Sequence, residues 1–197
     1  MKALVTGATG FVGSHLVRDL LARGVEVRVL ARKTSPWKNL ENLSVERAEG
    51  DVRDADSLAR AMRGCEAVFH AAAQYTFWEA DPRSYYDINL EGTKNVLRAC
   101  EKSKVKRLVY TSTIATVGGA RSPDALLNES ATYNLDETKD HYILSKKQAE
   151  TEVLKATQEG RLDAVIVNPG GPIGARDLKP TPTGFLLMKF INGEVPV

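Results

Sequence analysis

Tyr142 and Lys146 are the residues of this sequence whose types and spacing best suit proton transfer. In a helix, residues four positions apart share one face. An ammonium group beside a phenol favours the phenolate, and so lowers the tyrosine pKa from its usual value of about 10. We therefore expect Tyr142 to exchange a proton with a carbonyl or alcohol oxygen near neutral pH. The chain has 6 tyrosines, so a pair at this spacing arises by chance too readily to identify an enzyme by itself.

Two hydroxyl residues, Ser112 and Thr113, follow an apolar run at 108–111 that is typical of a strand. Their side chains suit hydrogen bonds to a substrate oxygen, but polar residues after a strand are equally typical of an ordinary turn. Both interpretations stay open on the sequence alone. The 3 histidines show no spacing with cysteine or acidic residues that is typical of a metal site, so we expect none. The Gly-x-Ser-x-Gly motif of many hydrolases is also absent from the sequence.

A glycine-rich turn, Thr-Gly-Ala-Thr-Gly-Phe-Val-Gly, occupies residues 6–13 between a strand-like run and a helical pattern. Glycines at this spacing allow a sharp turn, a close approach of backbone to phosphate, and tight packing of helix on sheet. The helix N-terminus then offers unpaired N–H groups to a pyrophosphate. Because strand, turn, helix and second strand occur in this order, the motif predicts dinucleotide binding. The cofactor contacts predicted here are Thr6, Gly7, Thr9, Gly10, Phe11, Val12 and Gly13.

The end of the second strand indicates which dinucleotide is bound. An NAD-specific site places an acid there for the ribose 2′-hydroxyl, whereas this chain has Arg32 and Lys33. A guanidinium at this position accepts a 2′-phosphate, so we predict NADP(H), with NAD(H) as the alternative if Arg32 only faces solvent. Asp51, after the third strand, is placed either to bind the adenine amino group or to serve as a turn or cap residue.

Short apolar runs alternate with helical patterns along the whole chain. Strands are predicted at 3–6, 26–30, 45–47, 67–70, 108–111 and 164–167, and helices at 11–23, 55–62, 84–102 and 140–158. Near-continuous apolar strands indicate a sheet covered on both faces. The alternation predicts an α/β fold, a doubly wound parallel sheet of the Rossmann type, with ligands at the carboxyl ends of its strands. Two irregular stretches, 118–139 and 168–184, follow strands and are the expected site of a substrate pocket.

Composition excludes several classes of protein. Of 197 residues, 43% are hydrophobic and 26% charged, which is the mixture of an ordinary globular domain. The net charge of +2 lacks the basic surplus of a nucleic-acid binder, so we expect no nucleic-acid partner. Cys65 and Cys100 are too few for a disulfide framework, and no apolar run is long enough to span a membrane. A cytoplasmic location without membrane contact is the expectation.

These motifs together resemble the extended short-chain dehydrogenase/reductase family. Residues 6–13 are similar to its dinucleotide turn, 50–54 to its adenine-contacting loop, and Tyr142 with Lys146 to its catalytic pair. The resemblance implies that Asn89 is the family's helix asparagine, and that Thr113 is the third catalytic residue, with Ser112 as the alternative. It implies further cofactor contacts at Val52, at the segment under the cofactor, and beside the nicotinamide; these residues are Val52, Ala71, Ala72, Ala73 and Pro169.

The reaction implied is reversible hydride transfer between the nicotinamide and a carbonyl carbon of a small molecule. Tyr142 would transfer the proton, and Lys146 would lower the pKa of Tyr142 and hold the nicotinamide ribose. Thr113 would position the substrate oxygen, and Asn89 would support a water relay. Aromatic residues after the fourth strand are expected either to form an apolar substrate wall or to pack on the core; they are Tyr75, Phe77 and Trp78.

Within that family, the sequence is similar to the dihydroflavonol-reductase-like branch. Residues 168–184 are most similar to bacterial hopanoid-associated sugar epimerases. The cysteine-containing stretch of the plant reductases is absent after Lys146, which argues against a flavonoid substrate. Ile114 and Ala115 replace the Asp-Glu pair of sugar-nucleotide dehydratases. Two alternatives to an NADP(H)-dependent reductase remain: a nucleotide-sugar epimerase with tightly bound NAD(P), and a non-catalytic dinucleotide-binding protein.

The resemblance also predicts the organisation of the chain. Residues 1–170 would form the NADP-binding domain, and 171–197 would begin the substrate-binding region. Family members normally continue well beyond this point, so we expect a piece of a longer protein, truncated at its C-terminus, that lacks most of the substrate domain and is inactive alone or only weakly active. A homodimer formed through the helices near 84–102 and 140–158 is a further expectation from the family.

Overall fold

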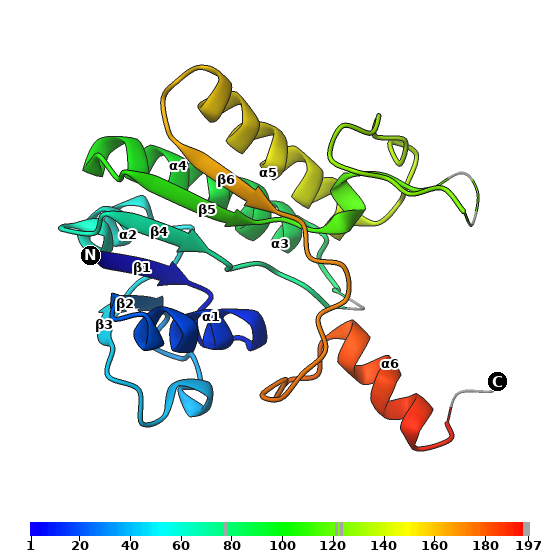
Figure 1. Ribbon diagram of the computed structural model, residues 1–197, viewed down its shortest axis with the longest axis horizontal. Helices are drawn as coiled ribbons and strands as arrows, with labels where there is room; N and C mark the ends of the chain where they lie inside the picture. The colour runs from blue at the N-terminus through cyan, green and yellow to red at the C-terminus, as the bar shows by residue number, and fades with distance from the viewer. Residues whose placement is uncertain (77–78, 121, 123, 195–197) are drawn as a thin grey trace.

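The computed structural model describes residues 1–76, 79–120, 122 and 124–194. Six parallel strands form one sheet in the order β3-β2-β1-β4-β5-β6 (Figure 1). The strand order reverses between β1 and β4, and this switch point opens a crevice beyond the carboxyl ends of the strands. The strands are β1 (Lys2–Thr6), β2 (Glu26–Ala31), β3 (Glu46–Glu49), β4 (Ala67–His70), β5 (Arg107–Thr111) and β6 (Ala164–Val167).

Helices cover both faces of the sheet (Figure 1). One face packs on α1 through a cluster that includes Val5, Val17 and Val29; the other packs on α2, α4 and α5 through a cluster that includes Leu4, Val96 and Val153. Alternate residues of β1 therefore serve opposite cores, as the two-residue period of a strand requires. The helices are α1 (Phe11–Ala22), α2 (Ala55–Met62), α3 (Arg83–Tyr85), α4 (Gly92–Ser103), α5 (His141–Gln158) and α6 (Pro182–Ile191), with 3₁₀ turns η1 (Lys38–Leu40) and η3 (Ile114–Thr116) and a π-helical segment η2 (Tyr86–Glu91).

The predicted α/β fold and parallel sheet are confirmed. Each predicted strand is present within one or two residues of its expected ends, and α2 has the bounds that were predicted. The α2 N-terminus is capped by Asp54, whose side chain accepts from the N–H groups of Asp56 and Ser57. Gly24, with φ of 72°, closes α1 in the left-handed conformation that favours glycine.

Two helical predictions were wrong in detail. The single helix expected at 84–102 is divided into α3, η2 and α4, because a π-helical segment interrupts it at the level of Asn89. The stretch expected to be irregular, 168–184, ends inside α6, whose first three residues from Pro182 belong to it. The helix is capped by the Thr181 hydroxyl, which accepts from the Gly184 N–H. Helix α6 stands away from the sheet (Figure 1). All of its residues are described, and none of them is buried. The division of the chain at residue 170 stays a prediction.

Candidate active site

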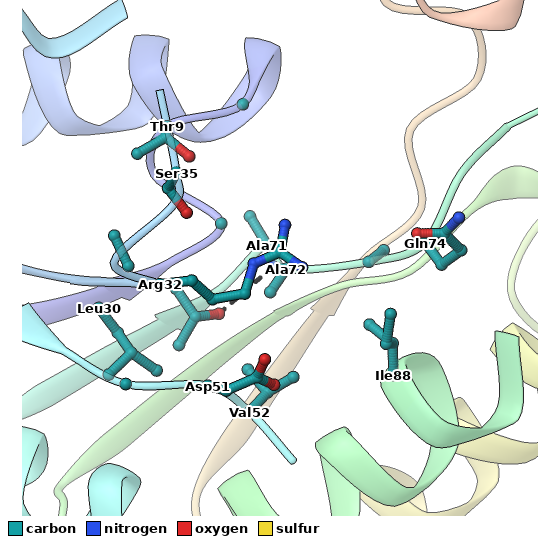
Figure 2. A pocket seen from close by; sticks show the side chains of 16 residues that line it. Thr9, Leu30, Arg32, Ser35, Asp51, Val52, Ala71, Ala72, Gln74 and Ile88 are labelled. Carbon is teal, nitrogen blue, oxygen red and sulfur yellow. Dashed lines mark hydrogen bonds between the residues drawn. The ribbon is translucent and has the colours of Figure 1, made fainter. Parts of the chain in front are cut away.

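A cleft of about 250 Å³ lies at the switch point, beyond the carboxyl ends of β1, β2 and β4 (Figure 2). The glycine turn forms one wall, and Gln74 and Ile88 lie at the far end. Ten predicted cofactor contacts line it together: Thr6, Gly7, Thr9, Gly10, Arg32, Asp51, Val52, Ala71, Ala72 and Ala73. Phe11, Val12 and Gly13 follow in the first turn of α1, and Pro169 lies past β6, where its carbonyl accepts from Ile114 N–H at 3.0 Å.

The turn at the cleft requires glycine at two positions. Gly7 has φ of 70°, and a Cβ there would lie 2.5 Å from the Ala72 nitrogen. A Cβ on Gly13 would collide with the Gly7 carbonyl oxygen. The turn therefore approaches the backbone after β4, and α1 approaches the turn, more closely than any side chain permits.

The N-terminus of α1 has the donor set that an anion needs. Its N-cap residue is Gly10, and within the described residues the first turn has neither a side-chain cap nor an acidic side chain. The first N–H groups of a helix have no intrahelical partner and carry partial positive charge. Together with the space that Gly7 and Gly10 leave, this cradle fits the pyrophosphate of a dinucleotide.

Arg32 and Asp51 lie on the β2–β3 side of the same cleft (Figure 2). The Asp51 carboxylate accepts from the Arg53 N–H at 2.9 Å and pairs with the Arg53 guanidinium at 2.7 Å. That hydrogen-bonded pair lowers the pKa of Asp51, and the charge of Arg32 adds to the effect. Asp51 is thus a turn residue, as one interpretation held, and also lines the cleft; contact with an adenine stays a prediction.

Tyr142 is close to Thr113 and to Tyr75. The side chain of Thr113 acts to lower the pKa of the phenol, and the Tyr75 ring packs on the Tyr142 ring with centroids 4.7 Å apart. Because Gln74 lines the cleft and Tyr75 follows it, the phenol lies just beyond the cleft's far end. The hydroxyl of Ser112 is buried and faces Thr116 at 3.4 Å, so the geometry favours Thr113 over Ser112 as the third member. Phe77 and Trp78 lie outside the described residues.

The expected lowering of the Tyr142 pKa by Lys146 is wrong for this structure. Burial raises the pKa of Tyr142 to about 12, although the hydrogen bond from Thr113 opposes the rise. Lys146 is turned to the sheet: its Nζ donates to the Thr111 carbonyl at 2.7 Å and lies 4.3 Å from the centre of the Tyr110 ring. Burial lowers the pKa of Lys146 to about 7. The two residues share a helix face, but burial is the largest cause of both pKa shifts, and Lys146 is not among the causes of the shift at Tyr142.

Asn89 occupies a structural position between the cleft and α5. It is 1% exposed; its side-chain oxygen accepts from Gln74 N–H at 2.8 Å, and its amide nitrogen donates to the Gln74 carbonyl and to the Ser145 hydroxyl. The amide is therefore committed to protein partners, and the predicted water relay gains no support from this geometry. The π-helical segment η2 presents Asn89 to both partners at once.

His70 connects the glycine turn with α4. Its Nδ1 lies 2.7 Å from the Thr6 hydroxyl, and its Nε2 lies 3.1 Å from the hydroxyl of Thr93. Since Thr93 donates to the Asn89 carbonyl at 2.6 Å, Nε2 carries the proton and Nδ1 accepts. Complete burial, reinforced by the charge of Lys146, lowers the pKa of His70 to about 3, so the ring is neutral at physiological pH.

Sequence reasoning missed several residues of the site. Ser35, Gln74 and Ile88 line the cleft, and no motif in the sequence marked them. Glu150 also went unnoticed, although it lies four residues after Lys146 and so repeats the spacing of the Tyr142–Lys146 pair. Within the described part of the chain, no cluster of histidine, cysteine and acidic residues is suited to a metal ion. None of the described helices is long and apolar enough to cross a membrane.

Comparison with known proteins agrees with this geometry. A family model described as "NAD dependent epimerase/dehydratase family" matches residues 3–194. A curated protein of Synechocystis sp. named "Putative dihydroflavonol 4-reductase" is 43% identical over 192 residues, which cover 98% of this chain and 55% of that protein. The chain spans little more than half the length of the curated relatives it matches.

Solved structures have the same fold. The crystal structure of gox2253 has a TM-score of 0.92 and 42% identity, and the match covers 98% of this chain and 58% of that one. A UDP-glucose 4-epimerase of Thermus thermophilus, solved in complex with NAD, has a TM-score of 0.86 and 32% identity, with 100% of this chain and 64% of that one covered.

Proposed function

We propose an NADP(H)-dependent oxidoreductase function for this chain, which belongs to the NAD dependent epimerase/dehydratase family, within the extended short-chain dehydrogenases/reductases. The substrate class is a small molecule with a carbonyl or hydroxyl group. The observation that carries the proposal is the placement of the Tyr142 phenol, close to Thr113, just beyond a cleft whose other wall is a glycine-lined anion cradle. A bound nicotinamide dinucleotide would supply the hydride in that arrangement.

Tyr142 is the proton donor in this proposal. With a pKa of about 12, the phenol holds its proton at neutral pH, which suits donation to an oxygen that gains charge as a carbonyl is reduced. Thr113 orients the phenol and the substrate oxygen through its hydroxyl. Lys146 contributes its ammonium to the ribose of the cofactor and to the field around Tyr142.

Residues of the cleft would hold the cofactor. The first turn of α1 with Gly7 and Gly10 would bind the pyrophosphate, and Asp51 with Val52 would adjoin the adenine. The pairing of Asp51 with Arg53 leaves the neighbouring Arg32 guanidinium to face the cleft, where it would accept a 2′-phosphate. NADP(H) is therefore the preferred cofactor in this proposal, and NAD(H) the alternative.

Calorimetric titration with NADPH and NADH tests the cofactor assignment. We expect NADPH to bind about tenfold tighter or more, because a charge-assisted contact to the 2′-phosphate is lost with NADH. Arg32→Ser should abolish that difference, whereas Lys33→Ser, the matched control at the next, exposed residue, should keep it. Equal affinity of the wild-type protein for both dinucleotides would refute the NADP(H) preference.

A nucleotide-sugar epimerase is the second candidate, favoured by the similarity to a UDP-glucose 4-epimerase with NAD. A screen of carbonyl substrates, on the protein in the form that its gene encodes, separates the two. Net loss of NADPH with each turnover indicates the reductase, and an isomerised product with no net loss indicates the epimerase.

A further inference from the structure

Glu150 carries a buried carboxylate for which the proposed function supplies no role. The residue is 7% exposed and lies one helical turn after Lys146 on α5, so both side chains share one face. A carboxylate removed from water costs several kcal/mol unless hydrogen bonds and an opposite charge compensate it. The hydrogen-bond and charge partners of Glu150 therefore indicate the role of its carboxylate.

The partners of Glu150 come from two other elements. Its Oε2 accepts from the Thr116 hydroxyl of η3 at 2.6 Å and from the Asn168 amide at 2.9 Å, just past the end of β6. The same Asn168 nitrogen donates to the Thr113 carbonyl at 3.1 Å. One carboxylate thus links α5 to Thr116 and to Asn168, the residue before Pro169, and through Asn168 to the Thr113 carbonyl.

Lys146 carries the buried ammonium on the face of α5 that Glu150 shares, one helical turn before it. Lys146 is 2% exposed, and its Nζ contacts are the neutral Thr111 carbonyl and the face of the Tyr110 ring. The other titratable groups near it are His70 of β4, which is neutral, and Tyr110 and Tyr142, whose pKa values burial raises. Glu150 is the carboxylate that acts against the desolvation of this ammonium.

Lys147, the residue after Lys146, also lies near Glu150, but its side chain is partly exposed to solvent. Its Nζ donates to the Thr116 carbonyl at 3.1 Å and lies 3.9 Å from Oε1 of Glu150. The Lys147 side chain is 29% exposed, so its charge is hydrated. The buried ammonium of Lys146 depends far more on a fixed internal counter-charge.

We infer that Glu150 is a positioning residue of the active site: its buried carboxylate keeps the Lys146 ammonium charged and fixes the segment from Thr113 to Thr116 against α5. The inference rests on the proposed function, because Lys146 and Thr113 are assigned there. A purely structural role would need only the acceptor oxygen that Thr116 and Asn168 bind. Glu150→Gln separates the two, since it preserves the size and one acceptor oxygen and removes the charge.

The titration of the Lys146 side chain, followed by NMR of the protein labelled at lysine, is the direct test. We expect Glu150→Gln to lower the titration midpoint of Lys146 by about one pH unit or more. Glu152→Gln, a control on the same helix in which the carboxylate pairs with exposed Lys155, should leave the midpoint unchanged. An unchanged Lys146 midpoint in folded Glu150→Gln would overturn the inference.

A double-variant cycle covers the case in which Glu150→Gln folds but is too unstable for the NMR titration. Leaving one member of a buried pair uncompensated destabilises a protein more than removing both. We therefore expect Lys146→Met with Glu150→Gln to fold, and to unfold at a higher urea concentration than Glu150→Gln alone. A double variant whose loss of stability equals or exceeds the sum of the single losses would overturn the inference.

Turnover adds a readout that keeps the two proposals apart. At pH 7, we expect Glu150→Gln to lower kcat about fivefold, because a midpoint lowered by one pH unit from about 7 reduces the charged fraction of Lys146 about fivefold. The loss should shrink below pH 6. A kcat that falls equally at every pH would assign Glu150 a structural role only. If the wild-type protein binds no dinucleotide, the proposed function fails, while the NMR titration still decides whether Glu150 holds the Lys146 charge.

Discussion

The N-termini of α1 and α5 lie at the same edge of the sheet, yet only the N-terminus of α5 has a side-chain cap among the described residues. Helix α1 begins at a glycine, and its first turn has no side-chain cap within the described residues. Helix α5 begins after Asp140, whose carboxylate accepts from the N–H groups of Tyr142 and Ile143 at 2.8 and 3.2 Å. Helix α1 leaves its first N–H groups available to a ligand. In α5, Asp140 accepts from the first N–H groups, and the helix presents side chains to the site instead.

The same contrast extends through the two halves of the site. On the α1 side, the groups that face the cleft are backbone and small side chains, so a bound anion completes the local hydrogen bonding. On the α5 side, the polar side chains are already bonded inside the protein, as in the Lys146 contact with Thr111 and the Asn89 contacts with Gln74. Under the proposed function, dinucleotide binding relies on one half and proton chemistry on the other. Variants should therefore separate the two.

Tyr142→Phe should give the largest effect and should touch only the chemistry. Removing the hydroxyl removes the proton donor, and general acid catalysis contributes roughly 10²–10⁴-fold, so kcat should fall by that factor. The Kd for NADPH should stay within about twofold, since the ring remains and general acid loss acts on turnover. Steady-state kinetics and calorimetry measure the two.

Tyr133→Phe is the matched control for that variant. Among the described residues, the Tyr133 hydroxyl donates only to the Leu135 carbonyl in its own loop, so the control should keep wild-type kcat. Full activity in Tyr142→Phe would remove Tyr142 from the mechanism and favour a protein that only binds dinucleotide.

Gly13→Ala should weaken NADPH binding by distorting the glycine turn. The added Cβ collides with the Gly7 carbonyl, so the turn must shift away from the α1 N-terminus. We expect a loss of about 1–3 kcal/mol in the free energy of unfolding from overpacking, and at least about tenfold weaker NADPH binding. Urea denaturation and calorimetry measure them.

Gly24→Ala supplies the comparison at the other end of α1. Gly24 also has a positive φ, of 72°, but a Cβ there meets nothing within 4 Å among the described residues. It should cost about 1 kcal/mol of stability and leave NADPH affinity unchanged. An affinity loss as large as that of Gly13→Ala would mean that stability, rather than the shape of the cradle, governs binding.

The buried histidine between the two halves predicts a pH dependence of stability. His70 has a pKa of about 3 in the folded protein, against an ordinary histidine pKa of 6.5, so between these pH values the unfolded chain binds more protons. The stabilisation is complete above pH 6.5 and is lost as pH falls toward 3, by up to about 1.4 kcal/mol per pH unit. Urea denaturation between pH 4 and 6.5 should show this slope in the wild type and a shallower one in His70→Gln. Equal slopes would contradict it.

The part of the fold that the sequence predicts well is the part in which local pattern and packing agree. Apolar strands such as 67–70 were located closely, and the glycine turn was correctly placed at a cleft. The helix expected at 84–102 is divided because Asn89 bonds Gln74, a residue fifteen positions away that no local pattern connects to it. Helix α6 was missed because proline and glycine dominate the segment before it, although Thr181 followed by Pro182 is a helix-start signal.

The direction of the Tyr142 pKa shift shows what spacing leaves out. A shared helix face brings two groups near each other, but the sign of the shift depends on burial, and burial of Tyr142 is decided by Tyr75 and by the fold around α5. Glu150 shows the reverse case. Its position was readable from the repeated spacing of four residues, while its partners Thr116 and Asn168 come from elements that only the folded chain brings together.

A reciprocal exchange of helix caps gives the smallest effects and the sharpest form of the comparison. Gly10 has φ of −78° and ψ of 179°, which any residue adopts, and a Cβ there meets only the Gly7 oxygen at 3.3 Å. In Gly10→Ser, the hydroxyl should accept an N–H of the first turn of α1 and stabilise the protein by a few tenths of a kcal/mol, roughly the difference between serine and glycine caps.

The same hydroxyl should weaken NADPH binding about tenfold, because it takes a donor and space that the pyrophosphate needs. Asp140→Gly makes the opposite change at α5 and should lose a few tenths of a kcal/mol or more, with NADPH affinity unchanged. Thermal denaturation and calorimetry on both variants measure the four quantities. Since the first variant gains stability as it loses affinity, a general loss of structure is ruled out as the cause. If Gly10→Ser bound NADPH as tightly as the wild type, the uncapped end of α1 would have no part in holding the cofactor.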